Sequence, residues 1–154
     1  MKSWVGFLII LVLFILQITL AEYVKIFNTK PDLILIGVII AALFCDQKWA
    51  LLLGLCAGAL KDAFAIQVPG INTVLFFIWS FLVINARRRF TLDFNGARAM
   101  LIGIIVLLQS IATRIIFLYL GIPVALGIFL RTAILGSVYT CLVSFALFKM
   151  LKIK

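Results

Sequence analysis

The residues of this chain that are able to do chemistry are charged side chains set inside apolar sequence. Lys61 and Asp62 lie side by side within one apolar stretch, and Arg114 and Arg131 interrupt two others. If these stretches lie in a bilayer, their charged groups should pair with one another or line a site. Asp62 is therefore expected to meet Arg114 or Arg131, or to form with them a small anion-accepting pocket.

The three charged residues Asp62, Arg114 and Arg131 are expected to lie at a similar depth in the membrane. Counted from the helix-breaking residues Pro69, Gly121 and Pro123, the three charges lie about 10–12 Å inside their segments at the helical rise of 1.5 Å per residue. This level falls in the outer half of the predicted membrane. The cluster of Asp62, Arg114 and Arg131 is either structural or a ligand pocket. In the structural interpretation the two arginines reach the outer headgroups and Asp62 pairs with Lys61 or with one of them. Lys61, about 100° round the helix from Asp62, is expected to point towards the headgroups.

The sequence offers no recognisable catalytic centre. It has no His, and its acidic residues are scattered: Glu22, Asp32, Asp46, Asp62 and Asp93. Paired carboxylates, a nucleophile with a base and a glycine-rich phosphate loop are all missing from the pattern. Its cysteines, Cys45, Cys56 and Cys141, are widely spaced within apolar runs, which predicts neither a zinc site nor a disulfide framework. We expect no enzymatic activity, no metal and no cofactor.

Small residues recur every four positions in two neighbouring segments. One stripe consists of Ala50, Gly54 and Gly58, continued by Asp62, and the other of Gly37, Ala41 and Cys45. Small residues at this spacing allow a second helix backbone to approach closely. The stripes predict either a tight hairpin in which the two segments pack on each other, or a docking face for another membrane protein.

Composition defines the elements that must position these residues. The chain has 154 residues, of which 66% are hydrophobic and 12% charged, and its mean hydropathy is +1.32. Soluble domains have about 25% charged residues, so we predict an all-α integral membrane protein. One transmembrane domain over residues 1–154 should contain six helices. Their expected ranges are 4–21, 33–45, 49–68, 71–86, 99–120 and 124–148.

The basic residues predict the orientation. With a cytoplasmic N-terminus and six crossings, one set of Lys and Arg falls on the cytoplasmic side: Lys2, Lys48, Arg87, Arg88, Arg89, Arg98, Lys149, Lys152 and Lys154. The outer side receives Lys25, Lys30 and Lys61. This bias predicts cytoplasmic N and C termini.

The net charge of +9 is therefore an orientation signal rather than a nucleic-acid footprint. Arg87, Arg88, Arg89 and Arg98 form a predicted cytoplasmic basic patch, with a secondary attraction to anionic lipid. An alternative concerns the first segment, which resembles a signal sequence ending at residues 19–21. A retained anchor is the favoured interpretation because the charge count already agrees with six spans.

Three stretches resemble a known family. The sequences KPDLILIGVIIAALF, GLCAGALKDAF and PGINTVLFFIWSFLV, the last followed by RRRF, are similar to the rod shape-determining protein MreD family. The resemblance covers roughly residues 31–90, and Lys61 departs from the apolar or neutral residue expected before the Asp. It implies a non-enzymatic subunit of the bacterial elongation machinery for peptidoglycan, in the inner membrane. The implied partners are MreC, the MreB filament and the RodA–penicillin-binding protein synthase.

The resemblance also implies a helical bundle related to the substrate-binding S-components of energy-coupling-factor transporters. This relationship supplies an alternative function, the capture of a vitamin or other micronutrient from outside the cell. A polar level in the outer half of the membrane would suit that role. S-components, however, use an Ala-x-x-x-Ala stripe on their first helix to meet a membrane partner, and residues 4–20 contain no Ala.

Overall fold

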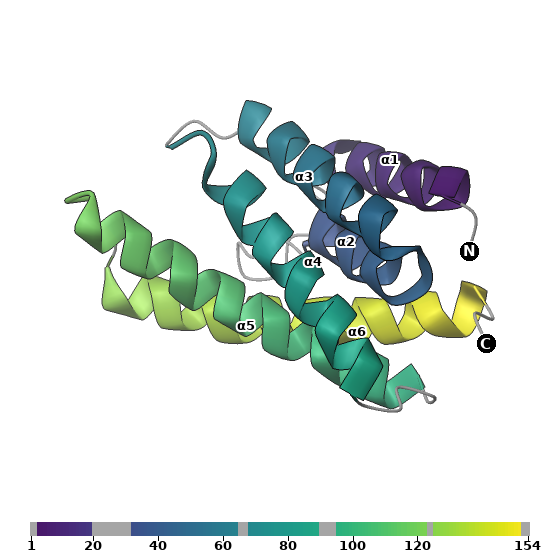
Figure 1. Ribbon diagram of the computed structural model, residues 1–154. Helices are drawn as coiled ribbons and strands as arrows, with labels where there is room; N and C mark the ends of the chain where they lie inside the picture. The colour runs from purple at the N-terminus through teal and green to yellow at the C-terminus, as the bar shows by residue number, and fades with distance from the viewer. Residues whose placement is uncertain (1–2, 20–31, 65–67, 90–94, 123–124, 152–154) are drawn as a thin grey trace. The chain divides into compact units, whose positions relative to one another are not determined.

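A computed structural model describes residues 3–19, 32–64, 68–89, 95–122 and 125–151. These residues form helices α1 (Ser3–Thr19), α2 (Leu33–Phe44), α3 (Gln47–Ala63), α4 (Ile71–Arg89), α5 (Asn95–Tyr119) and α6 (Leu126–Leu151) (Figure 1). The all-helical prediction is confirmed for this part of the chain. Two compact units are present, one containing α1–α4 and the other α5 and α6. The expectation of a single domain stays a prediction.

The third helix ends earlier than the sequence predicted. We expected it to continue to residue 68, but α3 ends at Ala63, and the Phe64 N–H bonds to the Lys61 carbonyl at 3.3 Å. Residues 65–67 lie outside the described residues. At the other end of the connection, Gly70 has φ 95°, a conformation that costs a glycine little. The Gly70 carbonyl then accepts the Val74 N–H at 3.1 Å, within the first turn of α4.

Helix α2 is the core of the first unit. It contacts α1, α3 and α4, and every residue from Ile34 to Leu43 is buried. This contact on all sides explains why its sequence is apolar around its whole circumference rather than along one stripe. Its 12 residues measure only about 18 Å, so its length suits a buried helix better than an independent span.

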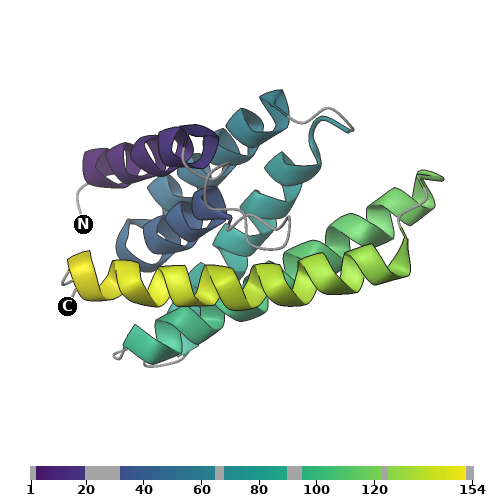
Figure 2. The same cartoon turned by 180° about the vertical axis from the view of Figure 1, so that it is seen from behind.

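The second unit is a pair of antiparallel helices, which Figure 2 shows side by side. The chain leaves α5 through Gly121, whose φ is 74°. The Gly121 N–H bonds to the Leu118 carbonyl and the Ile122 N–H to the Phe117 carbonyl, at 3.1 and 2.9 Å. This is the Schellman pattern, which satisfies carbonyls at a helix C-terminus and requires a left-handed residue.

The lengths of the helices agree with a membrane location. Among the described residues, Gly96–Tyr119 and Leu126–Lys149 are long and apolar enough to cross a bilayer. Trp4–Thr19 and Leu33–Phe44 are apolar but shorter.

Candidate functional site at the interface of α3 and α4

Gly54 and Gly58 of α3 face helix α4. A Cβ atom added at Gly58 would collide with the Thr73 Cα and would lie 2.8 Å from both the Asn72 carbonyl oxygen and the Thr73 nitrogen. A Cβ at Gly54 would collide with the Ser80 hydroxyl and would lie 3.2 Å from the Phe76 carbonyl oxygen. The absence of side chains at these two positions therefore sets the distance between the helices.

Helices α2 and α3 contact each other, but the predicted packing of the two small-residue stripes on each other is wrong for their glycines. Gly37 faces α1, where an added Cβ would lie 3.0 Å from the Leu13 Cδ1 and 3.3 Å from the Ile10 Cγ1. Gly54 and Gly58 face α4 rather than α2. Because α4 already fills the space beside these glycines, that part of the stripe is not open to a separate membrane protein. The other stripe residues, Ala41, Cys45 and Ala50, are buried within the unit.

The Asp62 carboxylate caps the N-terminus of α4. Its Oδ1 accepts the Asn72 backbone N–H at 3.1 Å and the Asn72 side-chain N–H at 2.8 Å. Its Oδ2 accepts the Thr73 backbone N–H at 2.8 Å and the Thr73 hydroxyl at 2.6 Å. The first N–H groups of a helix have no partner within the helix, and they favour a negative charge. Asp62, 6% exposed, meets both requirements.

This geometry corrects the expected depth of Lys61 and Asp62 in their helix. Both residues lie in the last turn of α3 rather than about 10 Å inside a longer helix. The Lys61 ammonium lies 5.0 Å from the centre of the Phe76 ring of α4, so this side chain contacts α4, and its orientation towards the headgroups stays a prediction. The cation–π contact adds a second link between α3 and α4 close to the Asp62 cap.

The two arginines predicted to join Asp62 belong to the second unit. The guanidinium carbon of Arg114 lies 4.5 Å from the centre of the Phe129 ring, which connects α5 to α6. The Arg114 Nη1 is buried without a hydrogen-bond partner among the described residues, whereas Arg131 is exposed. The pairing of Asp62 with either arginine, and a shared pocket, stay predictions.

Arginines at the C-terminal end of α4 form hydrogen bonds with the connection between α2 and α3. The Arg87 Nη1 donates to the Leu43 and Cys45 carbonyls at 2.7 and 3.1 Å, and the Arg88 Nη2 donates to the Gln47 Oε1 at 2.6 Å. A cation is favourable beside the carbonyls at a helix C-terminus. Arg88 and Arg89 are exposed, whereas Arg98, predicted in the same patch, is buried in α5.

Sequence reasoning missed several residues of this interface. Thr73 and Ser80 were not identified, and Arg87 was assigned only to orientation and a basic patch. Thr73 had a usable signal, because Asn72-Thr73 follows one residue after the breaker Pro69-Gly70, and Asn and Thr are typical of a helix start. Ser80 had none, since a single Ser in an apolar helix does not reveal what it faces. In the described residues, no three His, Cys, Asp or Glu side chains gather as potential metal ligands.

Replacing Ser80 with alanine is expected to leave the protein as stable or to stabilise it by up to about 1 kcal/mol. The Ser80 Oγ is buried and has no hydrogen-bond partner in the described structure, and an unsatisfied buried polar atom is costly. Removing this oxygen should also make Gly54→Ala less damaging, because the nearest remaining atoms would lie at 3.2 Å. Thermal unfolding of both single variants and the double variant in mild detergent measures this coupling. Strictly additive effects of the two substitutions on stability would contradict the close approach of the Ser80 hydroxyl to position 54.

The comparison with known families agrees with the sequence resemblance and extends it. The family model described as rod shape-determining protein MreD matches residues 1–154, which is the whole chain. The chain belongs to the MreD family. No curated protein and no solved structure matched it. Membership makes this a rod shape-determining membrane protein, and the MreD family is a structural rather than a known enzymatic family.

Proposed function

We propose that this chain is a non-enzymatic subunit of the bacterial elongation complex. In this role it helps to maintain rod shape and to organise peptidoglycan synthesis through contacts with MreC, the MreB filament and the RodA–penicillin-binding protein synthase. The observation that carries the proposal is the match of the MreD family model over residues 1–154. The interface of α3 and α4 supports a scaffolding role, because the Asp62 carboxylate binds the start of α4 and the Arg87 guanidinium binds the end of α2.

The proposed arrangement in the inner membrane has six spans and cytoplasmic termini. The first unit gives it partial support, because Arg88 bonds to Gln47 and Arg87 bonds to the end of α2. The basic residues Lys48 and Arg87–Arg89 therefore lie at one end of this unit, as the positive-inside rule requires of a cytoplasmic end. Lys61 and the compensating Asp62 lie at the opposite end of α3.

Reporter fusions provide a direct test of this topology. A reporter fused at residue 92 should give a cytoplasmic signal, and one fused at residue 122 a periplasmic signal. The reason is the strong bias of Lys and Arg towards one side of the predicted spans. A periplasmic signal at residue 92 would overturn the arrangement.

Co-purification tests the function. The tagged full-length chain, extracted in mild detergent, should recover MreC and the RodA synthase, and its depletion should round the cells. A tagged Gly127→Ala variant should recover the same proteins as the unchanged chain, because an added Cβ at Gly127 meets nothing within 4 Å. Recovery of an ATPase pair without MreC, with normal cell shape on depletion, would instead favour the S-component alternative.

A further inference from the structure

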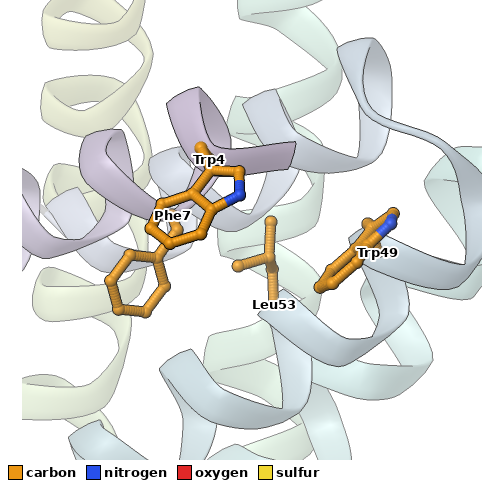
Figure 3. Close-up of a pocket in the computed structure, with 4 residues that line it drawn as sticks. All are labelled: Trp4, Phe7, Trp49 and Leu53. Carbon is orange, nitrogen blue, oxygen red and sulfur yellow. The ribbon is translucent and has the colours of Figure 1, made fainter. Parts of the chain in front are cut away.

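An apolar surface and a buried charge make different demands in a membrane. The groove between the beginnings of α1 and α3 is lined by Trp4, Phe7, Trp49 and Leu53 and has a volume of about 260 Å³ (Figure 3). Lipid tails satisfy such a surface without a specific contact, because they are as apolar as its side chains. A buried guanidinium, in contrast, requires an acceptor of opposite charge. The clearest demand for a ligand therefore lies at Arg114.

Helices α5 and α6 contain basic residues but no acidic ones. From residue 94 to residue 154 the sequence has six Lys or Arg and no Asp or Glu. The Arg114 Nη1 is buried without a hydrogen-bond partner among the described residues. Its guanidinium carbon lies 4.5 Å from the centre of the Phe129 ring of α6, so an aromatic ring covers one side of the cation. The anion that Arg114 requires must come from outside these two helices.

The Asp62 carboxylate, the partner that the sequence suggested, already has a full set of donors. It accepts four hydrogen bonds from Asn72 and Thr73, and a carboxylate has about four lone-pair positions. Another anion is therefore the better match for Arg114.

The level of the guanidinium in the membrane indicates which anion it meets. Phe129 lies near the start of the candidate span Leu126–Lys149, which has 24 residues and measures about 36 Å. The hydrocarbon core is about 30 Å thick, so a centred span places the Phe129 backbone roughly 1–2 Å below the edge of the core. Tyr119, the last residue of α5, is 93% exposed, which is typical of tyrosines at the headgroup level. The guanidinium therefore lies within reach of lipid phosphates.

We propose that Arg114, held beside Phe129, binds the phosphate of one phospholipid headgroup in the leaflet at the joined ends of α5 and α6. A guanidinium presents paired N–H donors that match phosphate oxygens, and the bilayer supplies phosphates at this level. An acidic side chain of another membrane protein is the less favourable source, because burying it in the membrane is costly. The proposal rests on α5 and α6 crossing the bilayer and not on the role in the elongation complex.

A tryptophan reporter beside Arg114 tests the proposal. Phe129→Trp keeps an aromatic ring against the cation, and indole is the best ring for this contact. The three native tryptophans, Trp4, Trp49 and Trp79, are replaced by Phe. The full-length variant is placed in bilayers of digalactosyldiacylglycerol, a neutral lipid without phosphate, that contain a minor fraction of brominated phosphatidylglycerol or brominated digalactosyldiacylglycerol. We expect several-fold stronger quenching by the brominated phosphatidylglycerol, and no loss of this preference when inorganic phosphate replaces chloride at matched ionic strength.

Three charge variants in the same background test the role of Arg114. Arg114→Gln should lower the preference for phosphatidylglycerol roughly fivefold, the usual effect of one basic residue near a membrane surface. Arg114→Lys keeps the charge and should retain most of the preference. Lys149→Gln removes a charge at the other end of α6, about 30 Å from Phe129 along the helix, and should leave the preference unchanged.

Four results would overturn the proposal: equal quenching by the two brominated lipids, no quenching by either lipid, an unchanged preference in Arg114→Gln, and competition by inorganic phosphate. If Arg114→Gln keeps the lipid preference but no longer recovers MreC, Arg114 instead binds an acidic side chain of a protein partner. Loss of the lipid preference with normal recovery of MreC would support the lipid site independently of the proposed function.

Discussion

Gly58→Ala is expected to destabilise the protein by about 3 kcal/mol, the upper part of the usual range for overpacking. The added Cβ would collide with the Thr73 Cα and would lie 2.8 Å from the Asn72 carbonyl oxygen. These are backbone atoms at the start of α4, and no side-chain rotation moves them away. Helix α4 must therefore shift as a whole, which also pulls its first N–H groups away from Asp62.

Membrane abundance and thermal unfolding in mild detergent measure this effect. A loss of about 3 kcal/mol corresponds to a fall in Tm of roughly 10 °C or more for a unit of this size. Gly127→Ala is the control, and it should be neutral or stabilising by up to about 1 kcal/mol, because alanine is the better helix former. Unchanged Tm and abundance for Gly58→Ala would show that α3 and α4 are further apart than described.

Asp62→Ala is expected to cost a similar amount, about 3 kcal/mol, through the loss of a helix cap and the exposure of unpaired buried donors. The substitution removes the acceptor from two backbone N–H groups and two side-chain donors of Asn72 and Thr73. Asp62→Asn keeps one acceptor oxygen and should have an intermediate effect. Lys61→Ala removes the cation–π contact with Phe76 and should cost less than Asp62→Ala, because such a contact contributes about 1 kcal/mol.

The chain contains a matched control for this prediction. Asp46 stands before the first turn of α3, is exposed, and makes no side-chain cap hydrogen bond. Asp46→Ala should therefore change stability by less than about 0.5 kcal/mol. If capping is the main role of Asp62, the stability changes caused by Asp62→Ala and by neutralising Arg114 or Arg131 should be additive. Recovery of stability in such a double variant would favour the predicted ion pair instead.

The sequence by itself determined that the chain is helical and where most helices begin. Long apolar runs leave the backbone no polar partner in a membrane except its own carbonyls, so helices are the expected structure. Local breakers fixed several helix ends: α4 begins directly after Pro69-Gly70, and α5 ends before Gly121. The family could also be recognised from the motifs around Asp62, since residue types and spacing are sufficient for that purpose.

The partner of each helix face was decided only by the tertiary structure. A stripe such as Gly54 and Gly58 shows that a backbone approaches, but it contains no information about which helix provides it. The nearest helix in sequence, α2, was the natural expectation, and α4 is the one found.

Asp62 shows the same limit in its electrostatics. The sequence showed a carboxylate that needed a partner and offered arginines as the obvious candidates. The structure supplies instead the unpaired N–H groups of a helix start, which exist only once α4 has formed and packed beside the end of α3. This partner is a set of backbone groups that folding brings together and not a particular residue type. It could therefore not be predicted from the sequence pattern.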